Sequence, residues 1–231
     1  MNKTNTAKAA LRAAFPATVP VMTGFLVLGF AYGILMQTKG YGVVWATAMS
    51  ALVLGGSIQY VAVTLLTTAF DPLQAFLLSL MVNARHLFYG LSLLDKYRGL
   101  GRVRPFLIFS LCDETFSLVS TLDVPEGVER KDFYFWISLL NYGYWVGATA
   151  LGALVGSHIP FDTTGLDFAL TALFVVLFLE QWKKRENRFP GAVGVGAAVV
   201  SAVVFGPDNL VIPAMVIMTA ILLGGRKRLC A

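Results

Sequence analysis

The chain has 231 residues, of which 57% are hydrophobic and 13% charged, and its mean hydropathy is +0.71. A soluble domain carries about 25% charged residues, so the composition excludes an ordinary soluble protein. Several stretches are long enough to cross a hydrocarbon core as a helix, which takes about 20 apolar residues. A transmembrane β-barrel would show alternating segments of about 10 residues, whereas these runs are continuous. We therefore predict an all-α, polytopic integral membrane protein.

The net charge of +5 does not indicate nucleic-acid binding, because the basic residues are not gathered on one stripe. They lie at the ends of apolar segments, in four clusters: Lys3, Lys8 and Arg12; Lys96, Arg98, Arg102 and Arg104; Lys183, Lys184, Arg185 and Arg188; Arg226, Lys227 and Arg228. Cytoplasmic loops of membrane proteins are enriched in Lys and Arg. We expect all four clusters, and with them both termini, to face the cytoplasm.

The apolar segments predict how the chain is organised. In chain order they span residues 16–37, 43–70, 72–95, 105–122, 133–156, 166–182, 190–205 and 209–224. Short polar or Gly-Pro stretches separate them, and we find no low-complexity region or soluble domain between them. The N-terminus shows no obvious signal-peptide cleavage site, so the first segment is expected to remain. The sequence predicts one transmembrane domain over residues 1–231.

The charge clusters conflict with a simple count of crossings. If every segment crossed once, the basic loop 96–104 would lie outside. The conflict disappears if segment 43–70 is broken at Gly55-Gly56-Ser57-Ile58-Gln59, since each glycine weakens a helix by roughly 1 kcal/mol relative to alanine. Segment 105–122 poses the same problem and carries Cys112-Asp113-Glu114 at its centre. We predict about six full spans plus two broken or re-entrant segments; the alternative is two ordinary tilted helices and one basic loop that departs from the rule.

The stretch MVNARHLFYG at residues 81–90 places an arginine deep in an apolar segment. A charged side chain at the centre of a membrane helix costs about 2.5–3.5 kcal/mol, so Arg85 needs a structural or functional reason. It lies too far from either segment end to reach the interface easily. Its guanidinium must meet a carboxylate, backbone carbonyls or a water-filled cavity. Tyr89 shares its helical flank, and Asn83, His86 and Gly90 share the neighbouring one.

Asp113 and Glu114 are the expected partners of Arg85. Two adjacent carboxylates repel when both are ionised, so either one of them holds a proton or Arg85 keeps one ionised. Both cases make the pair a candidate for proton coupling, while a purely structural clamp between two helices remains the alternative. His86 is either a proton relay or a hydrogen-bonding group between helices.

Further polar positions predict a binding site. Free backbone groups at a broken helix near Gly55, Gly56, Ser57 and Gln59 can hold a carboxylate or an amine, although small residues also allow close helix packing. Asn141 is a further polar point, whereas Asp167 is expected only to cap a helix. The four tryptophans mostly lie near segment ends, as in an aromatic belt.

No catalytic, metal or cofactor motif accompanies these residues. The sequence contains no G-x-S-x-G, no phosphate loop and only two histidines, His86 and His158. Cys112 and Cys230 suggest neither a disulfide framework nor a metal site. We expect a protein that is not an enzyme and needs no cofactor or metal.

Five motifs make a family resemblance visible. GGSIQY (55–60), NARHLFYG (83–90), CDETFSL (112–118), LLNYGYWVG (139–147) and DFALTALFVVLFLEQ (167–181) occur in the order and spacing typical of the AzlC family. The chain resembles these large subunits of bacterial branched-chain amino-acid exporters, also called azaleucine-resistance permeases. The resemblance implies a plasma-membrane permease that exports branched-chain or related hydrophobic amino acids, and a small AzlD-like partner subunit.

The resemblance and the residues lead to the same hypothesis for the site. Arg85, or a helix N-terminus near Gly56, would take the substrate's carboxylate, and Asp113, Glu114 or backbone carbonyls its ammonium group. Apolar neighbours would accept the branched side chain; these are Leu87, Phe88 and Phe116. Two other classes remain open, namely a membrane scaffold that transports nothing and a channel or carrier for another small solute.

Overall fold

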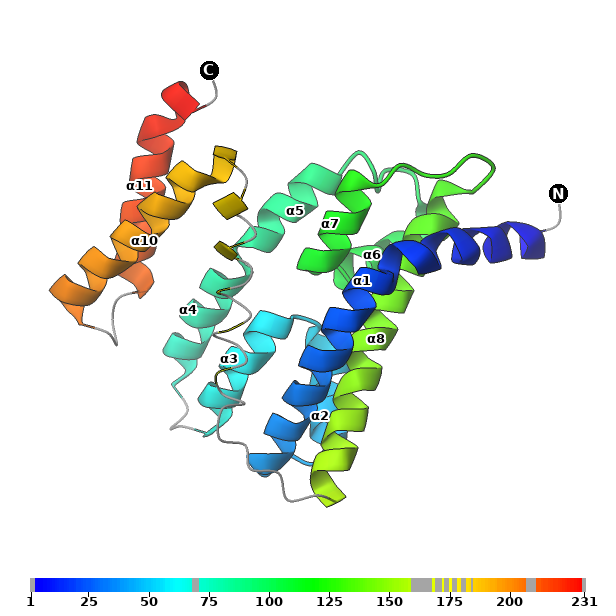
Figure 1. The fold of residues 1–231 in the computed structure, drawn as a ribbon, viewed down its shortest axis with the longest axis horizontal. Coiled ribbons are helices and arrows are strands. Elements are labelled where there is room, and N and C mark those ends of the chain that lie inside the picture. Colours follow the sequence, from blue (N-terminus) through cyan, green and yellow to red (C-terminus); the bar gives the residue numbers. More distant parts are fainter. Residues whose placement is uncertain are drawn as a thin grey trace. The chain divides into compact units, whose positions relative to one another are not determined.

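The computed structural model describes residues 3–67, 71–158, 168, 172, 175, 178–179, 182–183, 185–206 and 211–229. Every regular element among these residues is a helix, which confirms the predicted all-α class (Figure 1). The chain divides into two compact units, Met1–Ala169 and Leu170–Ala231, and each is treated by itself.

The helix bounds follow the predicted segments with some shifts. The first unit contains α1 (Lys3–Thr38), α2 (Val43–Val53), α3 (Gly56–Thr67), α4 (Pro72–Asn83), α5 (Arg85–Leu93), the 3-10 helix η1 (Gly101–Val103), α6 (Arg104–Phe109), α7 (Asp113–Thr121) and α8 (Arg130–His158), and the second contains α10 (Arg185–Phe205) and α11 (Val211–Leu229). Helices α1, α8 and α10 begin before the apolar runs that predicted them, because helical backbone extends into the basic flanks.

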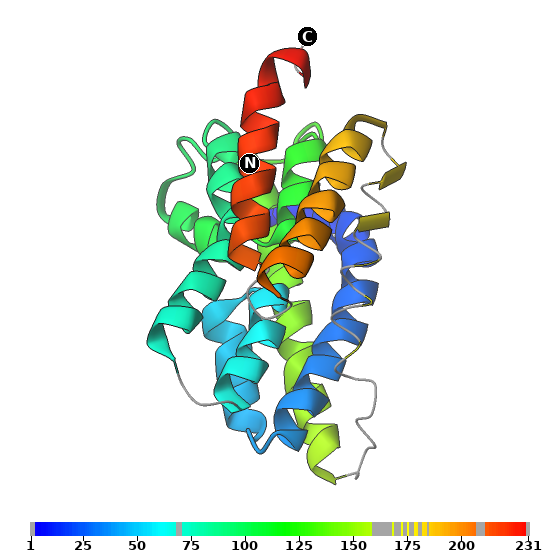
Figure 2. The same ribbon diagram turned by 90° about the vertical axis from the view of Figure 1, so that its left-hand side faces the viewer.

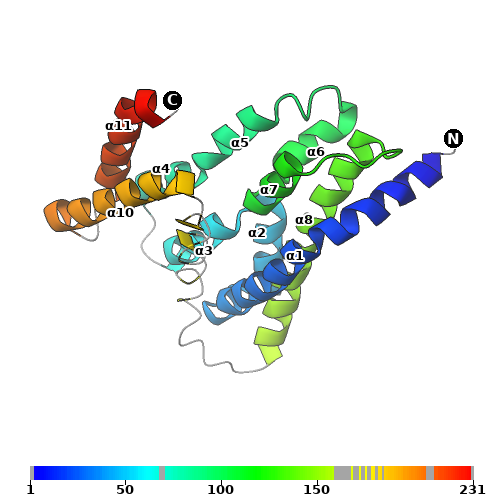
Figure 3. The same cartoon turned by 45° about the horizontal axis from the view of Figure 1, so that its top comes forward.

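Helices α1 and α8 run side by side and in the same direction (Figures 2 and 3). The hydroxyls of Thr18 and Tyr144 lie 3.2 Å apart nearer their starts, and Gly33 faces Gly152 further along. Glycine is required at this crossing, since a Cβ on Gly152 would collide with the backbone of Phe30. The pair is therefore held by direct backbone approach, as at many membrane helix interfaces.

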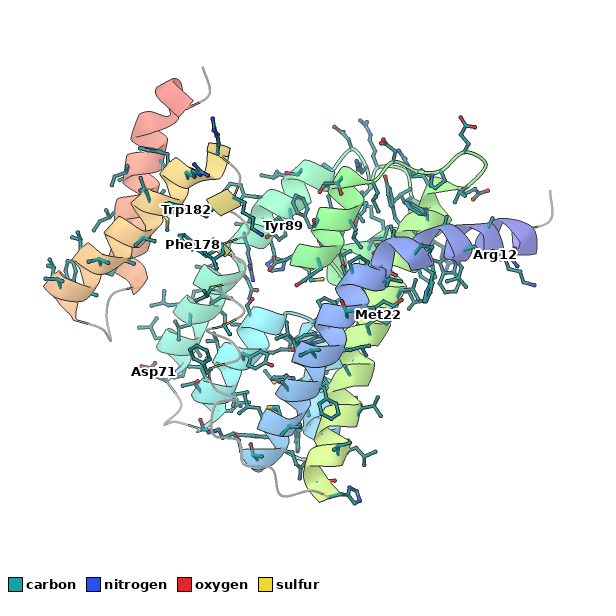
Figure 4. All side chains as sticks on the ribbon, in the orientation of Figure 1. Arg12, Met22, Asp71, Tyr89, Phe178 and Trp182 are labelled. Carbon is teal, nitrogen blue, oxygen red and sulfur yellow. The ribbon has the colours of Figure 1, made fainter. Side chains whose placement is uncertain are left out.

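Helix α1 is bent along its length. Figure 4 shows Arg12 and Met22 on two differently directed parts of the helix. Pro16 and Pro20 lie between them. A proline inside a helix removes a backbone hydrogen bond and clashes with the preceding turn, which accounts for the bend.

The predicted break in segment 43–70 is confirmed, and its geometry is that of a hairpin. Helix α2 ends at Val53, Leu54 takes a left-handed conformation with φ 32°, and α3 begins at Gly56. The Tyr41 hydroxyl, just before α2, donates to the Leu66 carbonyl near the end of α3 at 2.8 Å. The base of the hairpin therefore lies near the C-terminal end of α1, at Thr38 (Figure 1). The break lies slightly before the predicted position. Gly56, Ser57 and Gln59 are in the first turn of α3, not between the two helices.

Segment 105–122 is also broken, as predicted. Helices α6 and α7 are separated by residues 110–112. Near the end of α7, the carbonyls of Val119 and Ser120 accept from the Lys96 ammonium at 2.7 and 2.9 Å. Arg130, at the start of α8, donates to the Arg98 carbonyl at 2.8 Å. The loops on both sides of this second hairpin thus lie together, at the opposite end of the first unit from the α2–α3 base (Figures 1 and 2).

Segment 72–95 contains an interruption that the sequence did not predict. Ala84 separates α4 from α5, although its φ of −53° and ψ of −34° remain helical. The chain therefore continues in nearly helical backbone while Arg85 begins a new helix. Arg85 and Tyr89 still share one flank, as predicted.

The core of the first unit surrounds the second hairpin. The buried hydrophobic side chains of this cluster come from α1, α5 and the following loop, α6, α7 and α8, and include Leu93, Tyr97, Leu107, Val119 and Ile137. These contacts fix the α6–α7 hairpin against α5 and α8.

Within the second unit, α10 packs on α11. Gly194 faces the Met218 sulfur, and Gly191 faces the ring of Trp182. The rings of Phe178 and Trp182 have centroids 5.4 Å apart. Asp167, which we expected to cap a helix, and most of segment 166–182 lie outside the described residues.

Three helical stretches are long and apolar enough to cross a membrane by length and composition, among the described residues. They are Ala7–Thr38, Ala75–Leu93 and Arg188–Phe205. Helix α8 is not one of them, because it carries polar side chains, of which Ser138, Asn141 and Thr149 are at most 1% exposed. Its polar residues face protein, which is the place for them in a membrane helix. The count of six full spans and the single domain over 1–231 stay predictions.

The glycine at the α1–α8 crossing gives a first test. We expect Gly152→Ala to lower the free energy of unfolding by about 1–3 kcal/mol, because the added methyl group meets backbone that cannot move aside. The measurement is the thermal midpoint of the detergent-solubilised protein. Gly147→Ala, on the same helix with nothing within 4 Å of its Cβ position, is the matched control. Equal midpoints for the two variants would contradict the close packing.

The two hairpins predict which loops share a side of the membrane. Single cysteines replacing Lys39 and Asp71 should react with an impermeant thiol reagent from one side, and cysteines replacing Arg98 and Glu126 from the other. The unsubstituted chain gives the background. If positions 39 and 71 reacted from opposite sides, segment 43–70 would cross the membrane and the hairpin would be wrong.

Candidate functional site

The site is built around Arg85 at the start of α5. Its Nη1 lies 2.6 Å from Oδ2 of Asp113, the first residue of α7. Its Nη2 donates to the Ser57 hydroxyl, in the first turn of α3, at 2.7 Å. The prediction that Arg85 meets a carboxylate is confirmed, and the partner is Asp113. One guanidinium thus joins the tips of both hairpins.

Tyr89 completes the coordination of Asp113. Its hydroxyl donates to Asp113 Oδ1 at 2.7 Å, so each carboxylate oxygen has its own partner. The Tyr89 ring stacks on Phe116 with centroids 4.2 Å apart, one turn further along α7. On its other side the His86 ring lies 5.4 Å away in an edge-on contact. Figure 4 marks Tyr89 on α5. The i, i+4 spacing of Arg85 and Tyr89 is what lets one helix face hold both oxygens.

Arg85 has one N–H group that is not used in these contacts. Its Nε is buried and has no hydrogen-bond partner among the residues that the structure describes. A buried donor without a partner is costly and uncommon, so it marks a place where a further acceptor fits. The Arg85 side chain is 32% exposed and that of Asp113 is 25% exposed, which leaves the pair reachable from a cavity or from solvent.

Glu114 and His86 lie beside this pair without joining it. Glu114 directly follows Asp113 in the first turn of α7. His86 Nδ1 lies 3.3 Å from the Asn83 carbonyl, across the interruption between α4 and α5. The Asn83 contribution seen here is thus its backbone oxygen.

The tip of the first hairpin is anchored by a residue that sequence reasoning placed elsewhere. Trp145 Nε1 donates to Oε1 of Gln59 at 2.7 Å, and Gln59 Nε2 donates to the Met49 carbonyl at 3.0 Å. Gln59 is 0% exposed and Trp145 3%, so Trp145 is the exception among the four tryptophans, which mostly lie near segment ends. Its ring packs against Gly56, where a Cβ would lie 3.2 Å from it. The signal was available: the NYGYWVG stretch lies mid-segment, away from either interface.

Two tyrosines extend this anchor. The Tyr60 hydroxyl donates to the Leu28 carbonyl of α1 at 2.8 Å. Tyr32 stacks on Trp145 at 6.3 Å and lies 5.4 Å from the Tyr60 ring. The N-terminal turn of α3 is thus fixed to both α1 and α8, and sequence reasoning did not single out either tyrosine.

Asn141 holds the tip of the second hairpin. Its Nδ2 donates to the Thr115 hydroxyl at 3.1 Å, and the Cys112 sulfur lies 3.2 Å from the same hydroxyl. Asn141 and Thr115 are 1% and 0% exposed. Asn141 and Trp145 are one helical turn apart on α8, so a single face of this helix positions both hairpin tips.

The three apolar residues expected to accept the substrate's side chain do not lie together. Phe116 packs against Tyr89 beside the ion pair, whereas Leu87 and Phe88 are 69% and 68% exposed on α5. Gly55 lies before α3, and Gly56 and Ser57 lie in its first turn. No group of three His, Cys, Asp or Glu side chains suited to a metal ion occurs within the described part of the chain.

Comparison with known proteins decides the family. The family model described as "AzlC protein" matches residues 20–159, which include both hairpins and Arg85. The chain belongs to the AzlC family. The resemblance inferred from the five motifs is thereby confirmed.

Individual AzlC relatives extend the match over nearly the whole chain. The "Branched-chain amino acid transport protein AzlC" of Bacillus subtilis is 47% identical over 99% of this chain and 90% of its own length. An "Uncharacterized membrane protein" of Helicobacter pylori is 40% identical over 95% of this chain and 96% of its own. The "Inner membrane protein YgaZ" of Escherichia coli is 25% identical over 78% of this chain and 76% of its own. No solved structure matches. These names and the apolar helices make this chain a membrane protein.

The Trp145–Gln59 bond gives a test of the anchor. Trp145→Phe should lower the free energy of unfolding by about 1–3 kcal/mol, since it leaves a buried amide oxygen without its donor. The thermal midpoint of the purified protein measures this loss. Trp136→Phe, a partly buried tryptophan at the rim of the core, should have the smaller effect. The reverse order would contradict an anchoring role for Trp145.

Proposed function

We propose that this AzlC-family chain is the large subunit of a secondary transporter for branched-chain and related hydrophobic amino acids. Valine, leucine, isoleucine and methionine are the substrates expected, and the direction is export across the bacterial inner membrane. The name of the Bacillus subtilis relative supports the amino-acid class. The proposal needs no enzymatic activity and no cofactor.

The observation that carries the proposal is the meeting of two hairpin tips at Arg85. Transporter sites commonly form where discontinuous helices end inside the membrane, because helix ends leave backbone groups free for a ligand. Ser57 lies in the first turn of α3 and Asp113 begins α7, and Arg85 touches both. This supports a site for a ligand that carries both charges.

Each charge of an amino acid has a proposed counterpart. The substrate carboxylate would bind Arg85, whose Nε has no partner within the described residues, and the first turn of α3 at Gly55, Gly56 and Ser57. The ammonium group would bind Asp113, which requires the Arg85–Asp113 pair to open. Tyr89 would then keep its bond to Asp113 and orient it. Gln59 and Asn141 would position the two hairpin tips.

Proton coupling is proposed for His86, Asp113 and Glu114. Loss of the Arg85 contact leaves Asp113 in an apolar setting beside Glu114, where binding a proton relieves the repulsion between adjacent carboxylates. The substrate's ammonium group and a proton would then compete for the Asp113 carboxylate, and this competition would couple the two transport steps. A small AzlD-like membrane subunit is the proposed partner, and both termini are proposed to lie in the cytoplasm.

A double variant separates a transport site from a structural clamp. Removing one partner of an ion pair leaves an uncompensated charge, so Arg85→Gln and Asp113→Asn are each expected to destabilise the protein; the pair is partly exposed, so the cost stays below the roughly 3–5 kcal/mol typical of a buried pair. Combining them removes both charges and should restore the thermal midpoint. If the pair binds substrate, leucine efflux from loaded cells stays absent in the stable double variant. Restored efflux would instead support the clamp and contradict the site.

A second efflux measurement tests the coupling residues. Glu114→Gln in a protein that still folds should weaken the dependence of valine or leucine efflux on the proton gradient, because one of the two adjacent carboxylates can no longer titrate. Efflux is compared with and without an uncoupler, and Glu126→Gln in the loop before α8 is the control. Unchanged gradient dependence in a folded Glu114→Gln variant would exclude coupling through Glu114.

A further inference from the structure

A cavity that shares only His86 with the proposed site lies between α5 and α6. It has a volume of about 230 Å³, and its walls include His86, Gly90, Leu94, Arg104, Ile108 and Leu111. This volume corresponds to roughly seven or eight water molecules at about 30 Å³ each. It therefore suits a small molecule rather than a peptide.

The cavity wall contains one residue next to the basic loop, Arg104, and one residue next to Arg85, His86. Arg104 lies at the loop end, as the first residue of α6. His86 lies at the other end, and its ring contacts Tyr89, whose hydroxyl binds Asp113. A molecule entering beside Arg104 would thus be one aromatic side chain away from the Arg85–Asp113 pair.

The chemistry of the walls is that of an amphiphilic ligand. Leucine and isoleucine side chains form most of the surface, and one guanidinium stands at the loop end. Small-molecule sites combine apolar walls with a few polar groups that fix orientation. An anionic group would be held at Arg104 while an aliphatic group lies against buried Leu111 and the half-exposed Leu94 and Ile108.

Gly90 makes the space available. It lies on α5 between His86 and Leu94, and a Cβ at this position would meet nothing within 4 Å. Because Gly90 lines the cavity and its Cβ position is open, a larger side chain here has room to take up part of that volume. Glycine also weakens a helix relative to other residues, so its presence in the middle of α5 needs a reason other than stability.

We infer that this cavity is the intake chamber of the transporter, where an α-amino acid with a branched aliphatic side chain binds before it reaches Arg85 and Asp113. The inference rests on the proposed function and adds a location, a route and a selectivity to it. Arg104, in the cavity wall, directly follows the loop 96–104, and this loop is on the side proposed as cytoplasmic, from which an exporter takes up substrate.

Filling the cavity tests the inference. Gly90→Ala, Gly90→Val and Gly90→Leu should lower leucine efflux progressively, with a loss of about tenfold to hundredfold for Gly90→Leu, the factor that burial of one aliphatic side chain is worth. Alanine efflux, if the wild type carries it, should fall less, because its side chain needs little room. Gly147→Leu, whose Cβ position is also open, is the matched control, and membrane amount and thermal midpoint confirm folding.

Two arginine variants test the part of the chamber wall next to the loop. Arg104→Gln should raise the internal leucine concentration for half-maximal efflux, and Arg102→Gln, in η1 and outside the chamber wall, should not. A Gly90→Cys variant should react with a small thiol reagent, and leucine should slow that reaction. This variant remains informative if Gly90→Leu does not fold.

The outcomes separate the inference from the proposed function. A wild-type chain that moves no amino acid, with or without its partner subunit, overturns both. Normal wild-type efflux together with full leucine efflux by Gly90→Leu overturns the chamber alone. Modification of Gly90→Cys that leucine does not slow also overturns it and would fit a lipid chain in the cavity.

Discussion

The whole first unit depends on placing one permanent positive charge inside an apolar protein. Arginine cannot lose its proton under ordinary conditions, so its cost in a membrane has to be offset by partners rather than by neutralisation. Asp113 and Ser57 supply those partners from two different hairpins. Because both hairpins end at this point, the guanidinium fixes how deeply each of them enters the fold.

The hairpins in turn determine which backbone groups are available. Inside a membrane, irregular backbone is tolerated only where it is buried in protein or lines a cavity. Here α8 meets this condition by bonding one tip through Trp145 and the other through Asn141. The same helix packs closely on α1 through Gly152. A polar, buried α8 is therefore the scaffold that lets two helix breaks exist side by side.

Much of this arrangement was predicted from the free-energy cost of a charged side chain in the membrane and from the positions of the basic loops. The cost of Arg85 in hydrocarbon required a polar partner, for which the adjacent carboxylates were expected, and the count of basic loops favoured two broken segments. Neither argument could choose between Asp113 and Glu114, since both occupy one turn and only the rotation of α7 brings Asp113 to Arg85. Nor could it name Gln59 as the partner of Trp145, because a mid-segment position indicates burial but not which buried group the indole meets.

What the sequence by itself determined is the class, the helical segments, the two breaks and the family, because these follow from composition, local order and motif spacing. Tertiary structure decided which polar atoms meet, how the hairpin tips are held and where space is left beside Gly90. Those features depend on pairs of residues up to 86 positions apart, such as Gln59 and Trp145, whose contact is set by packing rather than by local pattern. Hydrophobic periodicity fixes which face of a helix is buried, but only the packed neighbours decide what that face touches.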